Sequence, residues 1–238
     1  MRPGVVAVLV SASLLTLGSA PPGGPAAQPL PARMADTGGG TQLITAVAPG
    51  TGSTTGTVTW WDRRGAGDGR WVRAGSAPAR FGAGGLTSGA TRVQGTNTTP
   101  TGLYDLPYAF GIRVAPRGTA YRYRPVRQDS WWCQDNASRA YNRWTEPRPA
   151  DCRAAEAEHL VTYTAQYAHA LVVGFNYHRP VRGRGAGIFL HVNGRGATAG
   201  CVSVPAEAMR RILRWAEPGE RPHLAIGTTG GATAITRY

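Results

Sequence analysis

A histidine and a cysteine ten positions apart are the side chains of this sequence whose types and spacing could do chemistry. His191 lies near the end of the apolar run 188–192, and Cys201 follows the small, glycine-rich loop 193–200. A cysteine attacks through its thiolate, and a free thiol has a pKa of about 8.5, so a neighbouring imidazole matters. Backbone N–H groups near Gly200 and Cys201 would suit a developing oxyanion. The pattern predicts thiol chemistry on a carbonyl group.

The apolar run before the loop has the alternation of a β-strand, whose successive side chains point to opposite faces. Ile188, Leu190 and Val192 would share a face suited to the core. His191 would lie on the other face, toward whatever the loop 193–200 builds. This loop is rich in small residues, so it is able to bring the cysteine back beside the histidine.

The three cysteines allow more than one chemistry. Zinc binding by His191, Cys201 and His178 is the alternative, but no CxxC or HExxH spacing accompanies them. We therefore expect neither a metal nor another cofactor. An odd number of cysteines in an exported chain favours one pair and one free thiol. Cys133 and Cys152, nineteen positions apart, are the expected disulfide, which leaves Cys201 free.

Short apolar runs separated by glycine-rich turns recur along the chain, which is typical of a β-rich domain. One helix is expected after Pro205, where apolar residues from Met209 to Ala216 follow helical spacing. A shorter helical turn is expected at 138–144. Strands are expected at 43–47, 57–61, 70–74, 103–106, 121–126, 160–167, 169–177, 187–192 and 223–226.

The N-terminus has the pattern of a secretory signal peptide. Arg2 supplies the positive charge, residues 5–17 are apolar, and cleavage is expected after Ala20 or nearer Ala27. The apolar run is shorter than the roughly 20 residues that span a bilayer, so we expect secretion to the cell wall without a membrane anchor. The expected organisation is a signal peptide at 1–27, a flexible Pro/Gly/Ala-rich leader at 28–41 and one domain at 42–238.

The sequence is strongly basic, with 26 basic and 13 acidic residues and a net charge of +13. Every basic residue is arginine, which is typical of a GC-rich genome and is compatible with a merely solvated arginine surface. A partner attracted by this charge would be an anionic polymer. No aromatic–basic RNA motif or recognition helix is present, so we expect a cell-wall polymer and no nucleic acid.

The residues around Cys201 resemble the signature of the L,D-transpeptidase catalytic domain, a family of cysteine enzymes that cross-link bacterial peptidoglycan. In that signature a histidine after an apolar strand is followed by a loop, Ser or Thr, any residue or His, Gly, Cys and an apolar residue. Here these positions hold His191, Thr198, Ala199, Gly200, Cys201 and Val202. Residues 99–104 are similar to the TPxGxF/Y segment of the family, and residues 130–143 to a Trp and Tyr-Asn-Arg segment of one secreted branch.

The resemblance implies a barrel-like or sandwich-like β domain and an acyl transfer. Cys201 would form a thioester with a tetrapeptide stem, and an amine of a second stem would receive the acyl group. His191 would act as the base, Gly200 would lie at the oxyanion site, and the Val192 carbonyl would orient the imidazole. The expected partners are peptidoglycan stem peptides.

The chain departs from the signature at positions that would touch substrate. Ala199 replaces a frequent histidine, Ser203 replaces a frequent Arg or Asn, and the loop after His191 is short. Arg195 is the candidate replacement for the arginine. Thr198, Ser203, Arg195 and His178 are the expected substrate contacts. The alternatives are a carboxypeptidase or amidase using the same cysteine, a zinc-dependent hydrolase, and a non-catalytic wall-binding module.

Overall fold

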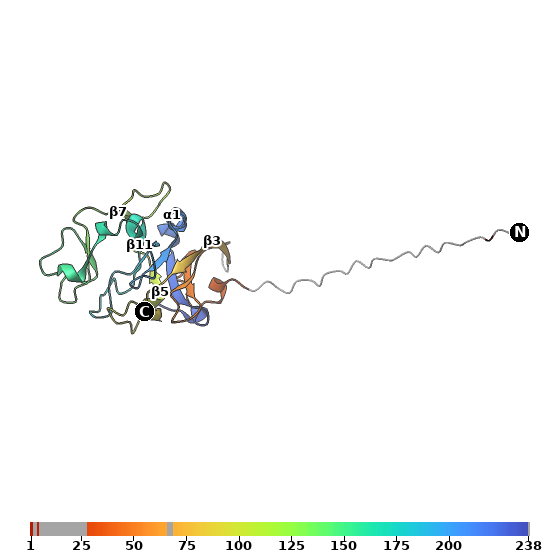
Figure 1. The fold of residues 1–238 in the computed structure, drawn as a ribbon, viewed down its shortest axis with the longest axis horizontal. Helices are drawn as coiled ribbons and strands as arrows, with labels where there is room; N and C mark the ends of the chain where they lie inside the picture. Colours follow the sequence, from red (N-terminus) through yellow and green to blue (C-terminus); the bar gives the residue numbers. More distant parts are fainter. Residues whose placement is uncertain (2–3, 5–27, 66–68, 238) are drawn as a thin grey trace.

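The computed structural model describes residues 1, 4, 28–65 and 69–237, and the remaining residues are drawn in grey in Figure 1. The predicted signal peptide, 1–27, therefore lies outside the described residues except for residues 1 and 4. No helix in the described part is long and apolar enough to cross a membrane.

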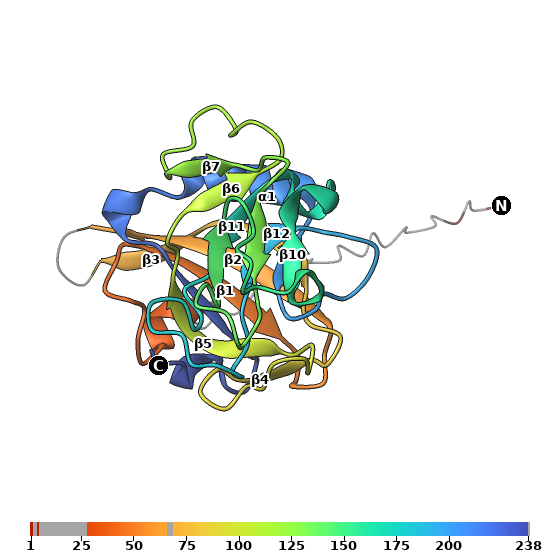
Figure 2. The same cartoon turned by 90° about the vertical axis from the view of Figure 1, so that its left-hand side faces the viewer.

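The described residues are mainly β, as predicted, with one α-helix (Figures 1 and 2). The strands are β1 (Gln42–Ala48), β2 (Thr55–Arg64), β3 (Arg70–Arg80), β4 (Leu86–Ser88), β5 (Thr99–Asp105), β6 (Ala109–Gly111), β7 (Tyr123–Pro125), β8 (Trp131–Cys133), β9 (Arg143–Thr145), β10 (Ala157–His159), β11 (Ala170–Val172), β12 (Phe189–Val192), β13 (Val202–Val204) and β14 (His223–Thr228). The helix is α1 (Ala206–Trp215). Short 3-10 helices are η1 (Leu30–Arg33), η2 (Ala154–Glu156), η3 (Leu160–Thr162), η4 (Gln166–Ala168), η5 (Pro218–Glu220) and η6 (Ala232–Ala234).

One mixed sheet holds most of the strands in the order β4-β5-β14-β1-β2-β3-β13-β12-β11-β6-β7. Its long antiparallel pair, β2 with β3, has a bulge between Trp60 and Trp61. Strand β1 pairs in parallel with β14, and β12 pairs in parallel with β13. These pairings bring segments distant in sequence to one sheet and place β12 between β11 and β13.

Strand β12 is buried on both faces, which is the reason that it reads as an apolar run. Leu190 and Val192 belong to the main core, together with Met209 and Leu213 of α1. Phe189 faces a second core cluster, which also contains Cys201. The alternation predicted for this strand is confirmed, and the helix predicted after Pro205 is α1. Helix α1 thus covers one side of β12 and leaves the other side for the site.

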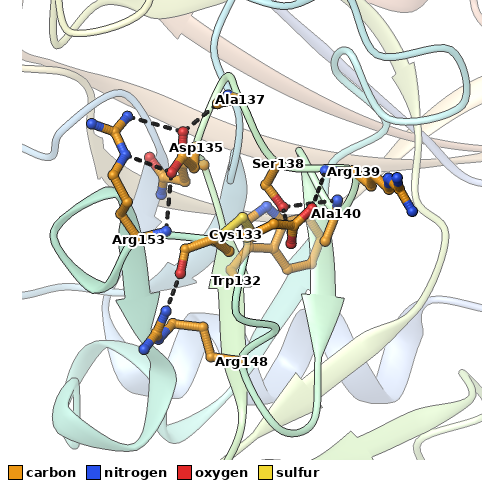
Figure 3. The surroundings of a disulfide bond; sticks show 12 residues. Trp132, Cys133, Asp135, Ala137, Ser138, Arg139, Ala140, Arg148 and Arg153 are labelled. Atoms are coloured by element: carbon orange, nitrogen blue, oxygen red, sulfur yellow. Dashed lines mark hydrogen bonds and ion pairs between the residues drawn. A yellow bond between two sulfur atoms is a disulfide. The ribbon is translucent and has the colours of Figure 1, made fainter.

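A second, three-stranded sheet of order β10-β8-β9 stands at one end of the fold, in the green part of Figure 1. The predicted disulfide between Cys133 and Cys152 is present and lies at the end of β8 (Figure 3). Beside it, the Asp135 carboxylate accepts hydrogen bonds from the side chain and backbone N–H of Arg153 and from the Ala137 N–H. These bonds hold the pKa of Asp135 well below its usual range. The disulfide and this ion pair fix the loops around the small sheet.

Four expectations differ from the structure. Of the strand expected at 169–177, only Ala170–Val172 form β11, and residues 175–177 form a turn. Residues 160–167 form η3 and the start of η4 instead of a strand. Leu160 and Tyr167 reach the second core cluster from these short helical turns and not from a strand paired in a sheet. The expected helical turn at 138–144 is a turn followed by β9. The expected leader, 28–41, packs on the domain: Leu30 and Met34 contact a third core cluster.

Candidate active site

The parallel pairing of β12 and β13 brings the two predicted residues to one place. His191 pairs with Ser203, so Cys201, two residues before Ser203, lies on the same face as the imidazole. The Phe189 N–H lies 3.4 Å from the Cys201 Sγ, and the Sγ lies 3.4 Å from the Gly187 carbonyl oxygen, to which the thiol donates. The cysteine is free and buried. Its sulfur is therefore held against the backbone of the neighbouring strand.

The His191 ring is fixed in orientation and tautomer. Its Nδ1 lies 2.8 Å from the Val192 carbonyl oxygen, which is the contact that the family resemblance implies. A carbonyl oxygen only accepts, so Nδ1 carries the proton and Nε2 keeps a lone pair. The Tyr167 ring packs edge-on against the imidazole at 5.6 Å between centroids. A neutral His191 therefore presents a basic nitrogen while its other nitrogen is held.

Cys201 lies between two pockets. The first, of about 190 Å³, is also lined by His191, by Tyr163 and Tyr167, and by the loop 194–199. The second, of about 410 Å³, extends to the other side. It is lined by polar side chains that include Arg92, Gln94, Asn97, Gln134, Asn136, Glu156 and Glu158. Glu158, Ala199 and Cys201 line both pockets, so Cys201 lies where the two meet.

The electrostatics of the site favour uncharged groups. Burial lowers the pKa of His191 to about 4, against the smaller effect of the Val192 carbonyl. Burial, reinforced by the negative charge of Glu158, raises the pKa of Cys201 to about 12, although the Phe189 N–H and Arg92 act in the opposite direction. In the free protein these shifts favour a thiol and a neutral imidazole over a thiolate–imidazolium pair at neutral pH.

The turn before Cys201 depends on Gly200, whose φ is +133°. A Cβ there would lie 2.9 Å from the Thr98 carbonyl oxygen and 2.8 Å from an Arg92 guanidinium nitrogen. Thr198 Oγ1 accepts the Gly200 N–H at 3.1 Å and donates to the Cys201 carbonyl at 2.6 Å. Because the Gly200 N–H is already bonded, the Cys201 N–H is the better candidate for an oxyanion donor. Thr198 holds the turn.

The other predicted contacts fall into two groups. Arg195 lines the first pocket, as does Thr198. Ser203 is fully buried, and its hydroxyl donates to Asn193 Oδ1 at 2.8 Å. His178 lies 2.8 Å from an Asp105 carboxylate oxygen and lines a separate pocket. Ser203 and His178 therefore line neither of the two pockets beside Cys201. Among the described residues no three His, Cys, Asp or Glu side chains converge on a metal-binding position.

The Tyr-Asn-Arg segment, noted above as a resemblance only, supports the wall of the site. Asn142 Oδ1 accepts hydrogen bonds from the Gly187 N–H and the Trp132 indole, both at 3.0 Å. Tyr141 accepts the Gly185 N–H at 3.0 Å. These bonds fix the backbone whose Gly187 carbonyl accepts the thiol proton of Cys201.

Four lining residues carry no motif in the sequence: Arg92, Gln134, Glu158 and Tyr167. They come from widely separated segments and meet only in the folded chain. Arg92 is 6% exposed and donates to the Thr98 and Arg184 carbonyl oxygens. No local pattern could have identified them as neighbours of Cys201.

A comparison with models of known families matches residues 53–224 to the YkuD L,D-transpeptidase catalytic domain. The chain belongs to this family. The matched range contains both His191 and Cys201 and most strands of the large sheet. No curated protein matches the sequence. Membership indicates an enzyme of the L,D-transpeptidase family and is consistent with action on peptidoglycan in the cell wall.

Proposed function

We propose that this protein is a peptidoglycan L,D-transpeptidase whose nucleophile is Cys201 and whose base is His191. The observation that carries the proposal is their common pocket, in which a buried thiol and an imidazole with a free Nε2 share one face of β12 and β13. Membership of the L,D-transpeptidase family supports this chemistry. The proposed catalytic domain is 42–238, because β1 and β14 lie side by side in the large sheet.

In the first half-reaction, Cys201 attacks the amide carbonyl between the L-centre of the third stem residue and the terminal D-alanine. His191 Nε2 takes the thiol proton as the sulfur–carbon bond forms, and the oxyanion is held by the backbone N–H of Cys201. The imidazolium then gives this proton to the leaving D-alanine amine as the carbon–nitrogen bond breaks. A thioester on Cys201 remains.

In the second half-reaction, an amine of another stem attacks the thioester carbonyl. Nε2 of His191 accepts a proton from that amine, the carbon–sulfur bond breaks, and the sulfur regains a proton from the imidazolium. The products are a cross-linked peptide and the free enzyme. No cofactor enters this sequence. Water in place of the amine would make the enzyme a carboxypeptidase.

The cellular setting proposed for this reaction is the cell wall, outside the cytoplasm. A disulfide between Cys133 and Cys152 is typical of exported proteins. The net charge of +13 suits anionic wall polymers as additional partners.

The test is the mass of the protein after exposure to a carbapenem, followed by product analysis with a tetrapeptide donor. The wild type should gain one equivalent of carbapenem on the peptide that contains Cys201, and Cys201→Ser should gain almost none. With donor and acceptor together, a cross-linked dimer should form. A folded wild-type protein that takes no adduct would instead support the wall-binding alternative, whereas an adduct with hydrolysis alone would support the carboxypeptidase.

A further inference from the structure

Glu158, at the centre of β10, is held so that its carboxylate borders the cleft. Tyr167 donates to one carboxylate oxygen at 2.6 Å and Gln134 donates to the other at 2.7 Å. The side chain keeps partial exposure and lines both pockets beside Cys201. An ionised carboxylate has room for about four hydrogen bonds, so these two donors leave acceptor capacity in the cleft.

This carboxylate has no cationic partner within residues 28–65 and 69–237. Other carboxylates of this arginine-rich chain do: Asp135 pairs with Arg153, Glu146 with Arg124, and Glu207 with Arg210. Glu158 forms no such ion pair among the described residues, and the effects on its pKa are burial and its hydrogen bonds with Tyr167 and Gln134. Burial raises its pKa, an effect that a bound cation would reverse.

Glu158 lies close to the Cys201 thiol, so a cation bound by its carboxylate would be part of a molecule that reaches Cys201. Its charge acts on Cys201, and the two residues are shared by both pockets. Tyr163 and Tyr167 line the same pocket, and aromatic side chains attract cations. A ligand held by this carboxylate would therefore lie beside a thioester on Cys201.

We propose that Glu158 binds the ammonium group of the acceptor stem and so directs the thioester on Cys201 toward an amine rather than toward water. This proposal rests on the proposed transpeptidase function. The carboxylate and the tyrosine side chains supply the recognition. The bound ammonium first releases one proton to water, because only the neutral amine can attack the thioester. His191 then accepts the second proton from the attacking amine and returns a proton to the sulfur, as described above. The donor stem could supply the same ammonium group. The kinetics of the first half-reaction, which involves only the donor, distinguish it from the acceptor stem.

The test uses Glu158→Gln, which keeps the size of the side chain and removes its charge. Glu217→Gln, at an exposed residue after α1, is the matched control for the change of charge. The full-length mature protein is acylated with a tetrapeptide donor, and the ratio of aminolysis to hydrolysis is measured by mass spectrometry. The acceptors are a stem peptide with a protonated amine and hydroxylamine, which is uncharged at neutral pH.

We expect Glu158→Gln to lower the kcat/KM for the charged acceptor about tenfold or more, the scale of one charge-assisted contact. With hydroxylamine as the acceptor, the ratio of aminolysis to hydrolysis should stay near that of the Glu217→Gln control. An unchanged ratio for the charged acceptor would overturn the proposal and leave the transpeptidase function intact. A raised KM for the donor in the first half-reaction would assign the ammonium to the donor stem and overturn the acceptor assignment. A wild type that forms the thioester but no aminolysis product would instead remove the transpeptidase function itself.

A second measurement needs no variant, should Glu158→Gln fail to fold. Tetramethylammonium carries the charge but cannot attack, so it should compete with the charged acceptor in the wild type and raise the hydrolysed fraction. Tetramethylammonium should not change the fraction of thioester that reacts with hydroxylamine. Absence of competition at concentrations that leave the protein folded would contradict the proposal.

Discussion

The ionisation state of Cys201 in the free protein is a direct consequence of its burial. With a pKa of about 12, the thiol should be about one part in 10⁵ ionised at pH 7 and about one part in 10³ at pH 9. The neutral His191, with a pKa of about 4, offers no imidazolium to stabilise a thiolate. The protein should therefore show almost no thiolate between pH 5 and pH 9.

The assay is a titration of thiolate ultraviolet absorbance, taken as the difference between the wild type and Cys201→Ser from pH 5 to 9. This subtraction removes tyrosine ionisation, since both proteins contain the same tyrosines. The expected difference is flat. Glu158→Gln should move the apparent pKa of the thiol downward, because the negative charge of Glu158 contributes to raising it. A full equivalent of thiolate at pH 7 that disappears only near pH 4 would refute the reasoning and indicate a preformed ion pair.

Three further changes probe the residues that position the site. Since burial holds the pKa of His191 at about 4 against 6.5 in the unfolded chain, the unfolded state binds the proton first as pH falls. About 3 kcal/mol of stability should thus be present above pH 6.5 and be lost toward pH 4, measured by urea unfolding of the wild type against His191→Asn. Gly200→Ala should lower the free energy of unfolding by about 2 kcal/mol or more and abolish most carbapenem acylation, because Gly200 has a positive φ and a Cβ there would contact the Thr98 carbonyl. The control is Gly196→Ala, which has open space around it and should change neither stability nor acylation. Replacing both Cys133 and Cys152 by alanine should cost about 3 kcal/mol in thermal or urea unfolding, and a change below 1 kcal/mol would show that the ion pair of Asp135 with Arg153 holds these loops alone.

Features set by local rules were predictable from the sequence. Strand β12 alternates because its two faces meet different core clusters, and α1 begins after Pro205 with its apolar side chains at helical spacing. The disulfide followed from counting cysteines and needed only that two of them lie close in sequence. Each of these features depends on a short stretch of chain. The alternation of β12, the helical spacing of α1 and the nearby pair of cysteines can all be recognised within such a stretch.

The small sheet was not predictable by the same means. Strands β8, β9 and β10 have three residues each, which is too short for a period of two to be recognised. Residues 160–167 have the apolar content of a strand, but the ring of Tyr167 is buried by packing on neighbouring aromatic rings. Tyr167 contacts the rings of Phe110 and Phe189. Tertiary packing thus decides the backbone here, and composition alone indicates the wrong element.

The same limit explains which part of the site was visible beforehand. His191 and Cys201 are joined by a short loop, so a sequence motif can record them together. Glu158 and its donors Gln134 and Tyr167 are positioned by β10, the disulfide loop and η4, and they converge only through the pairing of β8 with β10. The motif therefore describes the groups proposed to make and break the thioester, while Glu158, which is proposed to choose its acceptor, lies outside the motif. If the proposal holds, variation around Glu158 would change acceptor choice without altering the proposed pair of Cys201 and His191.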